Sequence, residues 1–219
     1  SPYAVTRMSA LKLLAELKDD NFIKATAAAL DDSYELIRRF AAVYCQESGD
    51  PRLAPALIKA VTDPNISKRV SYQATDALAY FDRDLLISGL DKRFEGMDTA
   101  NYFGDIYRNT LKSIEKETQV CRETLETITG PDETKKNRIF DIRSLRNLTY
   151  HPLVEPLCEY LLTAPGEKLE IVLTEALGWF TYSYRRQMII DTCSKIMSDP
   201  DRFTEPVRLE AQRTVNRLR

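Results

Sequence analysis

The sequence predicts an all-α solenoid of about six helix pairs followed by a terminal helix. Two segments, DPRLAPALIKAVTDP at 50–64 and HPLVEPLCEYLLTAP at 151–165, place proline at the same points of an apolar run. Arginine followed three residues later by alanine recurs in TRMSAL, IRRFAA and VRLEAQ, with a step of 31 residues from Arg7 to Arg38. Apolar residues recur at i, i+3, i+4 and i+7, the spacing of an amphipathic helix, and no segment has the pattern of a strand.

Each repeat is expected to contain two helices joined by a short turn that holds Asp, Gly or Pro. The first helix carries the alanine that lets a neighbouring helix approach closely. The second often has proline in its first turn, where the missing N–H costs nothing. The expected pairs are 3–17 with 20–30, 33–47 with 51–62, 66–81 with 83–95, 99–117 with 119–129, 136–149 with 152–163, and 167–181 with 183–197; a last helix is expected at 204–218.

The start and the middle of the array are expected to depart from the regular repeat. Ser1 before Pro2 is expected to cap the first helix. The segment 95–117 fits the repeat least well and is expected to be a long helix with an irregular start. GPDETKKNR at 130–138 has the composition of an exposed loop. We therefore predict one repeat domain over residues 1–219 with an irregular insertion at 95–138.

One sequence motif indicates a family resemblance. It consists of an aspartate near the end of one unit and Val/Ile-Arg-x-x-Ala in the next. It occurs as Asp32 with Ile37, Arg38 and Ala41, and its second half recurs at 207–211. In this the chain resembles the HEAT-repeat family, in its short variety also found in phycobilin lyase subunits. The resemblance implies a right-handed α-α superhelix of the HEAT/armadillo-like kind, with partners held on its concave side. Ser71 stands where the motif expects arginine, so an Asp–Arg ladder between repeats should break there.

The composition is that of an ordinary soluble globular protein, with 43% hydrophobic and 29% charged residues. There are 31 basic and 33 acidic residues, a net charge of −2, which disfavours nucleic acid as a partner because phosphate contacts call for a basic excess. No apolar run reaches the roughly 20 residues that cross a bilayer. A soluble protein is therefore expected, with the cytoplasm slightly favoured over other compartments.

The sequence contains no catalytic or metal-binding signature, so no enzyme activity and no cofactor are expected. No two of its four cysteines have the spacing of a zinc site, and Cys45, Cys158 and Cys193 fall on apolar stripes as buried thiols. His151, the single histidine, is expected to be a turn residue at a helix start. Asp19-Asp20 and Asp31-Asp32 are expected at turns as caps and solvated charge.

GWFTYSYRRQ at 178–187 holds the one tryptophan and two adjacent arginines. Phe180 falls on the apolar stripe of its helix and Trp179 at the edge of that stripe, so both are expected to pack. The helical spacing turns Tyr184 and Met188 outward. The same reasoning on the other second helices predicts a partner-binding ridge, which we call the candidate ridge, made of Lys24, Arg52, Lys59, Ile87, Tyr160, Tyr184, Met188 and Lys195.

The predicted function is a non-enzymatic scaffold that binds a protein partner, or a neighbouring domain, on its concave helix face. Because the chain opens without Met and closes on a half-repeat, it is also expected to be an accessory domain of a larger protein. An alternative is a DNA-binding enzyme that resembles the HEAT-like DNA glycosylases, which Trp179, Tyr184, Arg185 and Arg186 suggest. The balanced charge speaks against that alternative.

Overall fold

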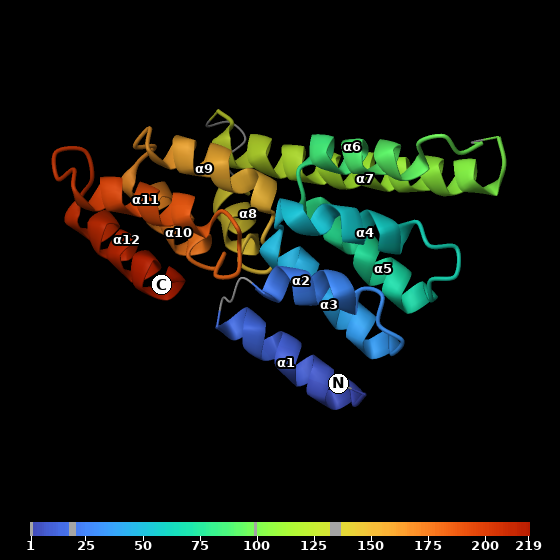
Figure 1. Cartoon of the computed structure of the whole chain (residues 1–219). Coiled ribbons are helices and arrows are strands. Elements are labelled where there is room, and N and C mark those ends of the chain that lie inside the picture. Colours follow the sequence, from blue (N-terminus) through green and yellow to red (C-terminus); the bar gives the residue numbers. More distant parts are fainter. Residues whose placement is uncertain (1, 18–20, 99, 132–136) are drawn as a thin grey trace. The chain divides into compact units, whose positions relative to one another are not determined.

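A computed structural model describes residues 2–17, 21–98, 100–131 and 137–219 (Figure 1). These residues form twelve α-helices with three short 3₁₀ segments, and no strand occurs among them. The all-α prediction is thus confirmed, whereas the right-handed superhelical arrangement stays a prediction. No described helix is both long enough and apolar enough to cross a membrane.

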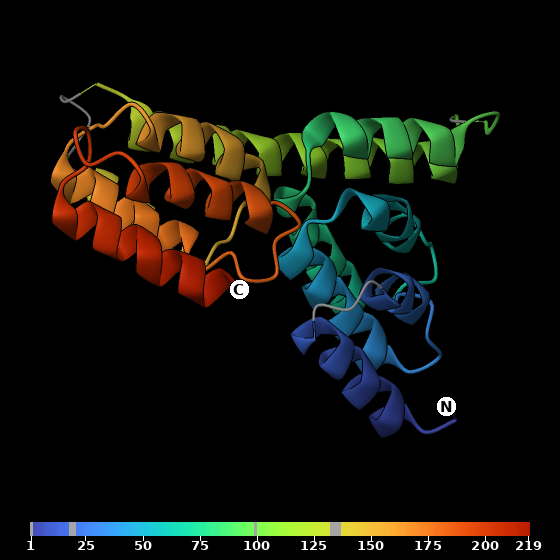
Figure 2. The ribbon, with the colours of Figure 1, turned by 60° about the vertical axis from the view of Figure 1, so that its left-hand side comes forward.

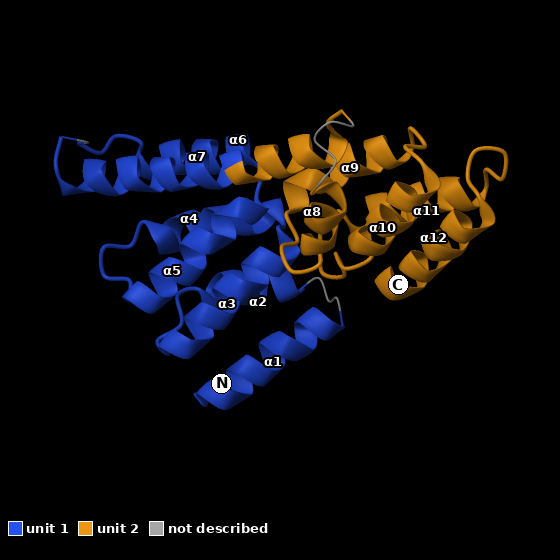
Figure 3. Cartoon of the chain, turned by 180° about the vertical axis from the view of Figure 1, so that it is seen from behind, with its two compact units in different colours: residues 1–119 blue, residues 120–219 orange. Residues whose placement is uncertain are grey.

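The chain divides into two compact units, residues 1–119 and 120–219 (Figure 3). The prediction of one repeat domain over the whole chain stays a prediction.

Unit 1 contains α1 to α6 in two alternating rows. The helices are α1 (Ala4–Glu16), α2 (Asn21–Ala29), α3 (Glu35–Ser48), α4 (Ala54–Val61), α5 (Lys68–Asp76) and α6 (Arg83–Phe94). Consecutive helices pack together at α1–α2, α2–α3 and α4–α5. Each helix also packs on the next but one, so that α1, α3 and α5 form one row and α2, α4 and α6 the other (Figures 1 and 2).

Local sequence signals set the ends of these helices. Gly49 ends α3 in the left-handed conformation, at φ 55°, which glycine adopts without strain. The Asp50 carboxylate then accepts a hydrogen bond from the Arg52 N–H, and Pro51 occupies the first turn of the next helical segment. Asp82 caps α6 in the same way, by accepting from the N–H groups of Asp84 and Leu85. The boundaries predicted from Asp, Gly and Pro therefore lie close to the observed ones.

Small side chains let the rows of unit 1 approach closely. Ala41 and Cys45 on α3 are fully buried, and so is Ala74 on α5, in the same row.

Arg7 on α1 donates two hydrogen bonds to the Asp32 carboxylate, at 2.7 and 2.8 Å. Arg38 instead donates to the Asp32 backbone carbonyl, at 2.6 Å. The motif aspartate thus pairs with the arginine of the preceding repeat.

The helix α7 (Tyr102–Thr129) is continuous over 28 residues and passes through the boundary between the units. The prediction of two helices, 99–117 and 119–129, is wrong. No proline or glycine interrupts Glu117–Gln119, so nothing in the local sequence breaks the hydrogen-bonding pattern. The long helix expected within 95–117 does occur, but it begins at Tyr102 and continues twelve residues beyond 117, to Thr129.

Unit 2 repeats the alternating pattern with shorter helices at its start. After the second part of α7 come α8 (Arg138–Ser144), α9 (Val154–Leu161), α10 (Glu167–Leu177), α11 (Arg186–Met197) and α12 (Glu205–Leu218). The helices α8, α10 and α12 pack in one series, and α9 packs on α11. The predicted helices 136–149 and 167–181 end early, at Ser144 and Leu177. At the second of these, Gly178 ends the helix.

The turn predicted at Asp19-Asp20 falls on residues outside the described ranges, as does Ser1 itself. The helix start predicted at Ser1-Pro2 is wrong, because Tyr3 is the N-cap of α1, which begins at Ala4. The second acidic pair lies at a turn as predicted, with Asp31 exposed and Asp32 partly buried. Asp31 forms an ion pair with Lys59 of α4. Both aspartates therefore join neighbouring elements in addition to lying at a turn.

Candidate functional site

The segment 178–187 divides between core and surface. Phe180 is buried, as its place on the apolar stripe predicts, and Trp179 is half-buried. Tyr182 and Tyr184 lie exposed in the turns that lead to α11, which begins at Arg186. The segment thus exposes the aromatic side chains of Tyr182 and Tyr184, while the buried Phe180 holds its backbone in place.

Trp179 lies under two guanidinium groups. The central carbon of the Arg146 guanidinium is 4.3 Å from the ring centroid, and that of Arg217 is 4.8 Å away. Such cation–π contacts each stabilise the pair by about 0.5–1 kcal/mol at an exposed site. Arg217 also donates to the Glu175 backbone carbonyl, at 3.3 Å. These contacts hold the indole against the turn after α8 and against α12.

Gly178 makes this arrangement possible. A Cβ at this position would lie 2.5 Å from an Arg217 nitrogen and 3.0 Å from the Thr214 hydroxyl. Only a residue without a side chain lets α12 approach the end of α10 so closely. The glycine therefore positions Arg217 over the neighbouring indole ring.

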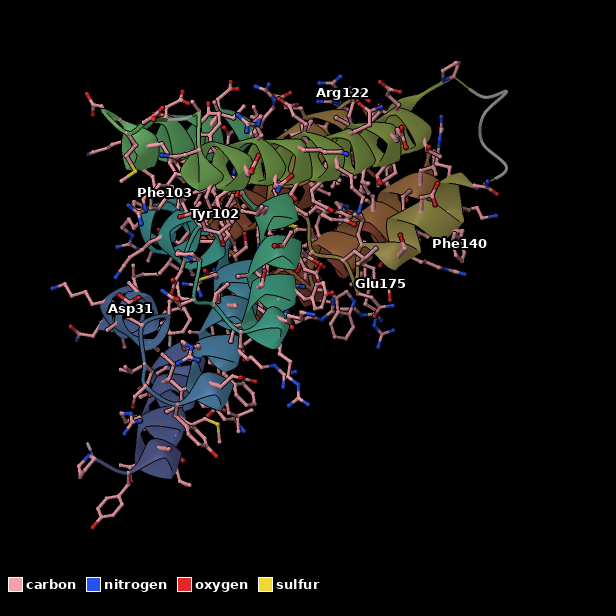
Figure 4. All side chains as sticks on the ribbon, turned by 90° about the vertical axis from the view of Figure 1, so that its right-hand side faces the viewer. Asp31, Tyr102, Phe103, Arg122, Phe140 and Glu175 are labelled. Carbon is pink, nitrogen blue, oxygen red and sulfur yellow. The ribbon has the colours of Figure 1, made fainter. Side chains whose placement is uncertain are left out.

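A hollow of about 480 Å³ opens beside the indole, within unit 2. We call it the tryptophan hollow; it is lined by Arg143, Arg146, Asn147, Val172, Glu175, Ala176 and Trp179. Val172 and Ala176 are buried and provide an apolar floor, while the charged side chains are exposed. Figure 4 shows Glu175 on the side of α10. The hollow combines an aromatic ring, two cations, one carboxylate and one amide.

A second hollow, of about 410 Å³, lies in unit 1 at the turns that follow α2 and α4. We call it the charged hollow, because its lining includes Asp31, Arg38, Lys59, Asp63 and Arg93. The ion pair of Asp31 with Lys59 crosses part of it. Asp63 accepts a hydrogen bond from the Asn65 N–H at 2.9 Å, as a turn residue does. Charged groups of both signs therefore line this hollow.

Four residues of the candidate ridge lie in unit 1. Lys24 on α2 is exposed, and Ile87 on α6 is half-buried. The Arg52 guanidinium is held by the Asp50 carboxylate, at 2.6–3.2 Å. Lys59 lines the charged hollow. Two of the four predicted contact residues are thus already engaged by carboxylates of the chain itself.

The other four lie in unit 2. The Tyr160 hydroxyl accepts a hydrogen bond from Arg138 at 3.5 Å, and Lys195 on α11 is exposed. Tyr184 is exposed, and its hydroxyl accepts from Arg185 at 2.7 Å. Met188 is half-buried on α11. The candidate ridge as a binding surface stays a prediction.

His151 begins a 3₁₀ segment beside Pro152, as predicted, but its ring is completely buried. Its Nδ1 lies 2.8 Å from the Ser183 hydroxyl, and its ring meets Phe180 edge-on at 5.8 Å. The interpretation as a simple turn residue is therefore incomplete. Ser183 is buried too, and its oxygen accepts from the Arg185 N–H at 3.1 Å, so this Ser–His pair joins two turns.

The sequence did not indicate Arg143, Arg146 or Arg217 as neighbours of Trp179. Arg143 and Arg146 belong to the predicted helix 136–149, and Arg217 to the predicted last helix. No motif or spacing connects these residues to Trp179. The two adjacent arginines that the sequence suggested, Arg185 and Arg186, do not line the tryptophan hollow.

The described residues include no group of three or more His, Cys, Asp or Glu side chains that could hold a metal ion. The four cysteines are free and buried, as predicted for Cys45, Cys158 and Cys193. Burial raises the pKa of the Cys45 and Cys193 thiols to about 12. These thiols are therefore protonated at neutral pH.

Comparison with known proteins gives one informative similarity. No family model matches the chain. A stretch of 76 residues is 40% identical to the peptidoglycan muramidase Tse3 of Pseudomonas aeruginosa. The stretch covers 35% of this chain and 17% of that protein. The similarity is to part of an enzyme, and it overturns the prediction that this protein has no enzymatic role.

Proposed function

We propose that this chain is a helical recognition module of a protein related to the peptidoglycan muramidase, and that it binds a polypeptide partner. The tryptophan hollow is the single observation that carries this proposal. It presents an aromatic ring and two arginines above an apolar floor. Trp, Tyr and Arg are the residues that most often dominate binding energy at protein interfaces.

The alternating contacts within each unit support a short HEAT-like array as the scaffold of this module. In such an array, every repeat contacts only its neighbours, which leaves a long helix face open to a partner. Tyr160 and Lys195 of the candidate ridge come from such helices in unit 2, with Tyr184 in the turn before α11, and Lys24 and Lys59 come from those in unit 1. We propose these residues as further partner contacts.

Capture of a partner from a lysate of the source organism, followed by mass spectrometry and repetition with the purified partner, tests the proposal. The Lys59→Glu, Tyr160→Ala, Tyr184→Ala variant is expected to lose the purified partner. A matched variant, Lys12→Glu, Tyr72→Ala, Tyr102→Ala, changes the same residue types at exposed positions outside the candidate ridge and should retain it. Circular dichroism must first show equal helicity. Equal binding by both variants would refute the ridge.

Cleavage of peptidoglycan glycan strands is the second candidate function, and the similarity to the muramidase favours it. Most glycoside hydrolases use two carboxyl groups that flank the scissile bond. Asp31 and Asp63 both line the charged hollow. Release of reducing ends from purified peptidoglycan, lost in the Asp31→Asn and Asp63→Asn variants, would support this candidate. No release by the unmodified chain would eliminate it. DNA binding that weakens with salt would instead favour the glycosylase alternative.

A further inference from the structure

We infer that the tryptophan hollow binds the carboxylate of a short peptide segment. The inference rests on the proposed function, because it specifies the chemistry of the polypeptide partner. It is carried by the charges, the contacts and the size of the hollow.

Two guanidinium groups in the hollow have no carboxylate partner among the described residues. Arg143 and Arg146 are three residues apart, and both side chains are exposed. Elsewhere in unit 2 arginines do pair, as Arg185 with Glu155 at 2.7 Å and Arg213 with Glu210 at 3.1 Å. A guanidinium binds a carboxylate through two parallel hydrogen bonds, which gives both strength and direction. The hollow therefore offers an anion site that the chain itself does not fill.

The tryptophan restrains one of these two cations. The Arg146 guanidinium lies over the indole at 4.3 Å, so part of its conformational freedom is lost before any ligand arrives. A side chain that is already ordered costs less entropy on binding. The indole is in turn contacted by Arg217, whose guanidinium donates a hydrogen bond to the backbone carbonyl of Glu175. The anion site is thus preorganised by contacts between the turns after α8 and α10 and the helix α12.

The remaining groups favour a carboxylate over a phosphate. Glu175 brings one negative charge into the hollow beside two positive ones, so the lining carries a net charge of one positive. A single carboxylate balances this charge, whereas a chain of several phosphates carries more negative charge than the lining can balance. The lining also contains a carboxylate that accepts hydrogen bonds, that of Glu175, and an amide that both donates and accepts them, that of Asn147. Val172 and Ala176 form a floor for a small apolar side chain.

The volume is also appropriate. About 480 Å³ lies within the range of sites that enclose small ligands, roughly 300–1,000 Å³. A segment of two or three small residues with a free carboxylate would occupy it. A folded domain would not enter, so the ligand is the end of a chain or an extended peptide.

The single tryptophan makes the test direct, because all indole fluorescence comes from Trp179. The probe is N-acetyl-trialanine with a free carboxylate, and its matched control is the same peptide with a C-terminal amide. Titration of the whole chain should give a saturable fluorescence change with the acid and binding at least about tenfold weaker with the amide. Each tenfold corresponds to about 1.4 kcal/mol. Calorimetry provides a second readout that does not depend on the indole.

Variants locate the site. Arg143→Gln and Arg146→Gln should each weaken binding of the acid about tenfold, since each removes one charge-assisted contact. Arg122→Gln is the matched control, because Arg122 is an exposed arginine of α7 that lies well away from Glu175 in Figure 4. It should leave the affinity unchanged. Equal binding of acid and amide, or equal loss in all three variants, would overturn the inference.

Two further outcomes separate the possibilities. Tighter binding of a short oligothymidylate than of the acid would identify a phosphate site and refute the carboxylate assignment. If neither peptide binds while the partner capture still depends on the candidate ridge, the inference fails and the proposed function stands. If the acid binds as expected but capture of the partner is the same for the ridge variant, the carboxylate site in the tryptophan hollow is supported. The candidate ridge is then refuted as a binding surface.

Discussion

The ionisation of Asp32 couples the helix α1 to the turn between α2 and α3. The Arg7 hydrogen bonds hold its pKa below the usual range, and its side chain is only 11% exposed. A lowered pKa in the folded state means that the carboxylate stabilises the fold above the unfolded pKa of about 4 and that this contribution is lost as the pH falls through the folded value. Asp32→Asn should therefore lower the urea midpoint at neutral pH and have a smaller effect near pH 3. Urea titrations at both pH values measure this.

The neighbouring Asp31→Asn is the control for that measurement. Its ion pair with Lys59 is exposed on both sides, and exposed pairs contribute little. Its urea midpoint should stay close to that of the unmodified protein at both pH values. An equal loss in both variants would mean that the Arg7 contact is not the source of the effect.

Substitution by alanine should have opposite effects on stability at two glycines. Gly89 lies inside α6, where a Cβ would meet Ile58 at an ordinary 3.5 Å. Gly89→Ala should therefore stabilise the fold by about 0.5–1 kcal/mol. Gly178→Ala would displace Arg217 from Trp179, so it should destabilise and shift the indole emission. Thermal melts with fluorescence detection check both. Stabilisation by Gly178→Ala would contradict the close approach of α12.

At the scale of the element, the continuity of α7 is the feature most open to test. Proline inside a helix removes one hydrogen bond and clashes with the preceding turn, at a cost of about 3 kcal/mol. Thr118→Pro should lower the free energy of unfolding by about that amount, because residue 118 lies well inside α7. Circular dichroism during denaturant unfolding measures it.

A proline in the first turn of the same helix is the matched comparison. Tyr102→Pro places the ring where no intrahelical N–H bond exists, so it should cost little. If Thr118→Pro cost as little as Tyr102→Pro, two separate helices would be the better description of 102–129.

At the scale of the whole molecule, the four buried cysteines report on the integrity of both units. Cys45 lies in unit 1 and Cys121, Cys158 and Cys193 in unit 2, all below the surface. Burial raises the pKa of the Cys158 thiol to about 11 and that of Cys45 and Cys193 to about 12. Because the thiolate is the reactive form, a thiol reagent at about pH 8 should react slowly with the native protein. In concentrated guanidinium chloride all four should react quickly. Rapid reaction of one thiol in the native protein would reveal local opening of its unit.

The sequence by itself determined the helices and most of their ends. The apolar spacing within 167–181, the Gly49 stop and the Asp50-Pro51 start act through neighbours three or four residues away, so they can be read along the chain. The burial of Cys193 follows from the same spacing within α11, whereas Phe180 is buried in the turn after α10. These local signals predicted an all-α chain of paired helices.

Only the tertiary structure decided which distant side chains meet. Arg146 and Trp179 come from the turns that follow α8 and α10, and the pairing of Arg7 with Asp32 joins α1 to the turn after α2. The Gly178 contact with Arg217 depends on how closely α12 packs on α10. The tryptophan hollow therefore could not be derived from spacing, because whole helices packed against one another bring its lining together, and no local pattern encodes their separation.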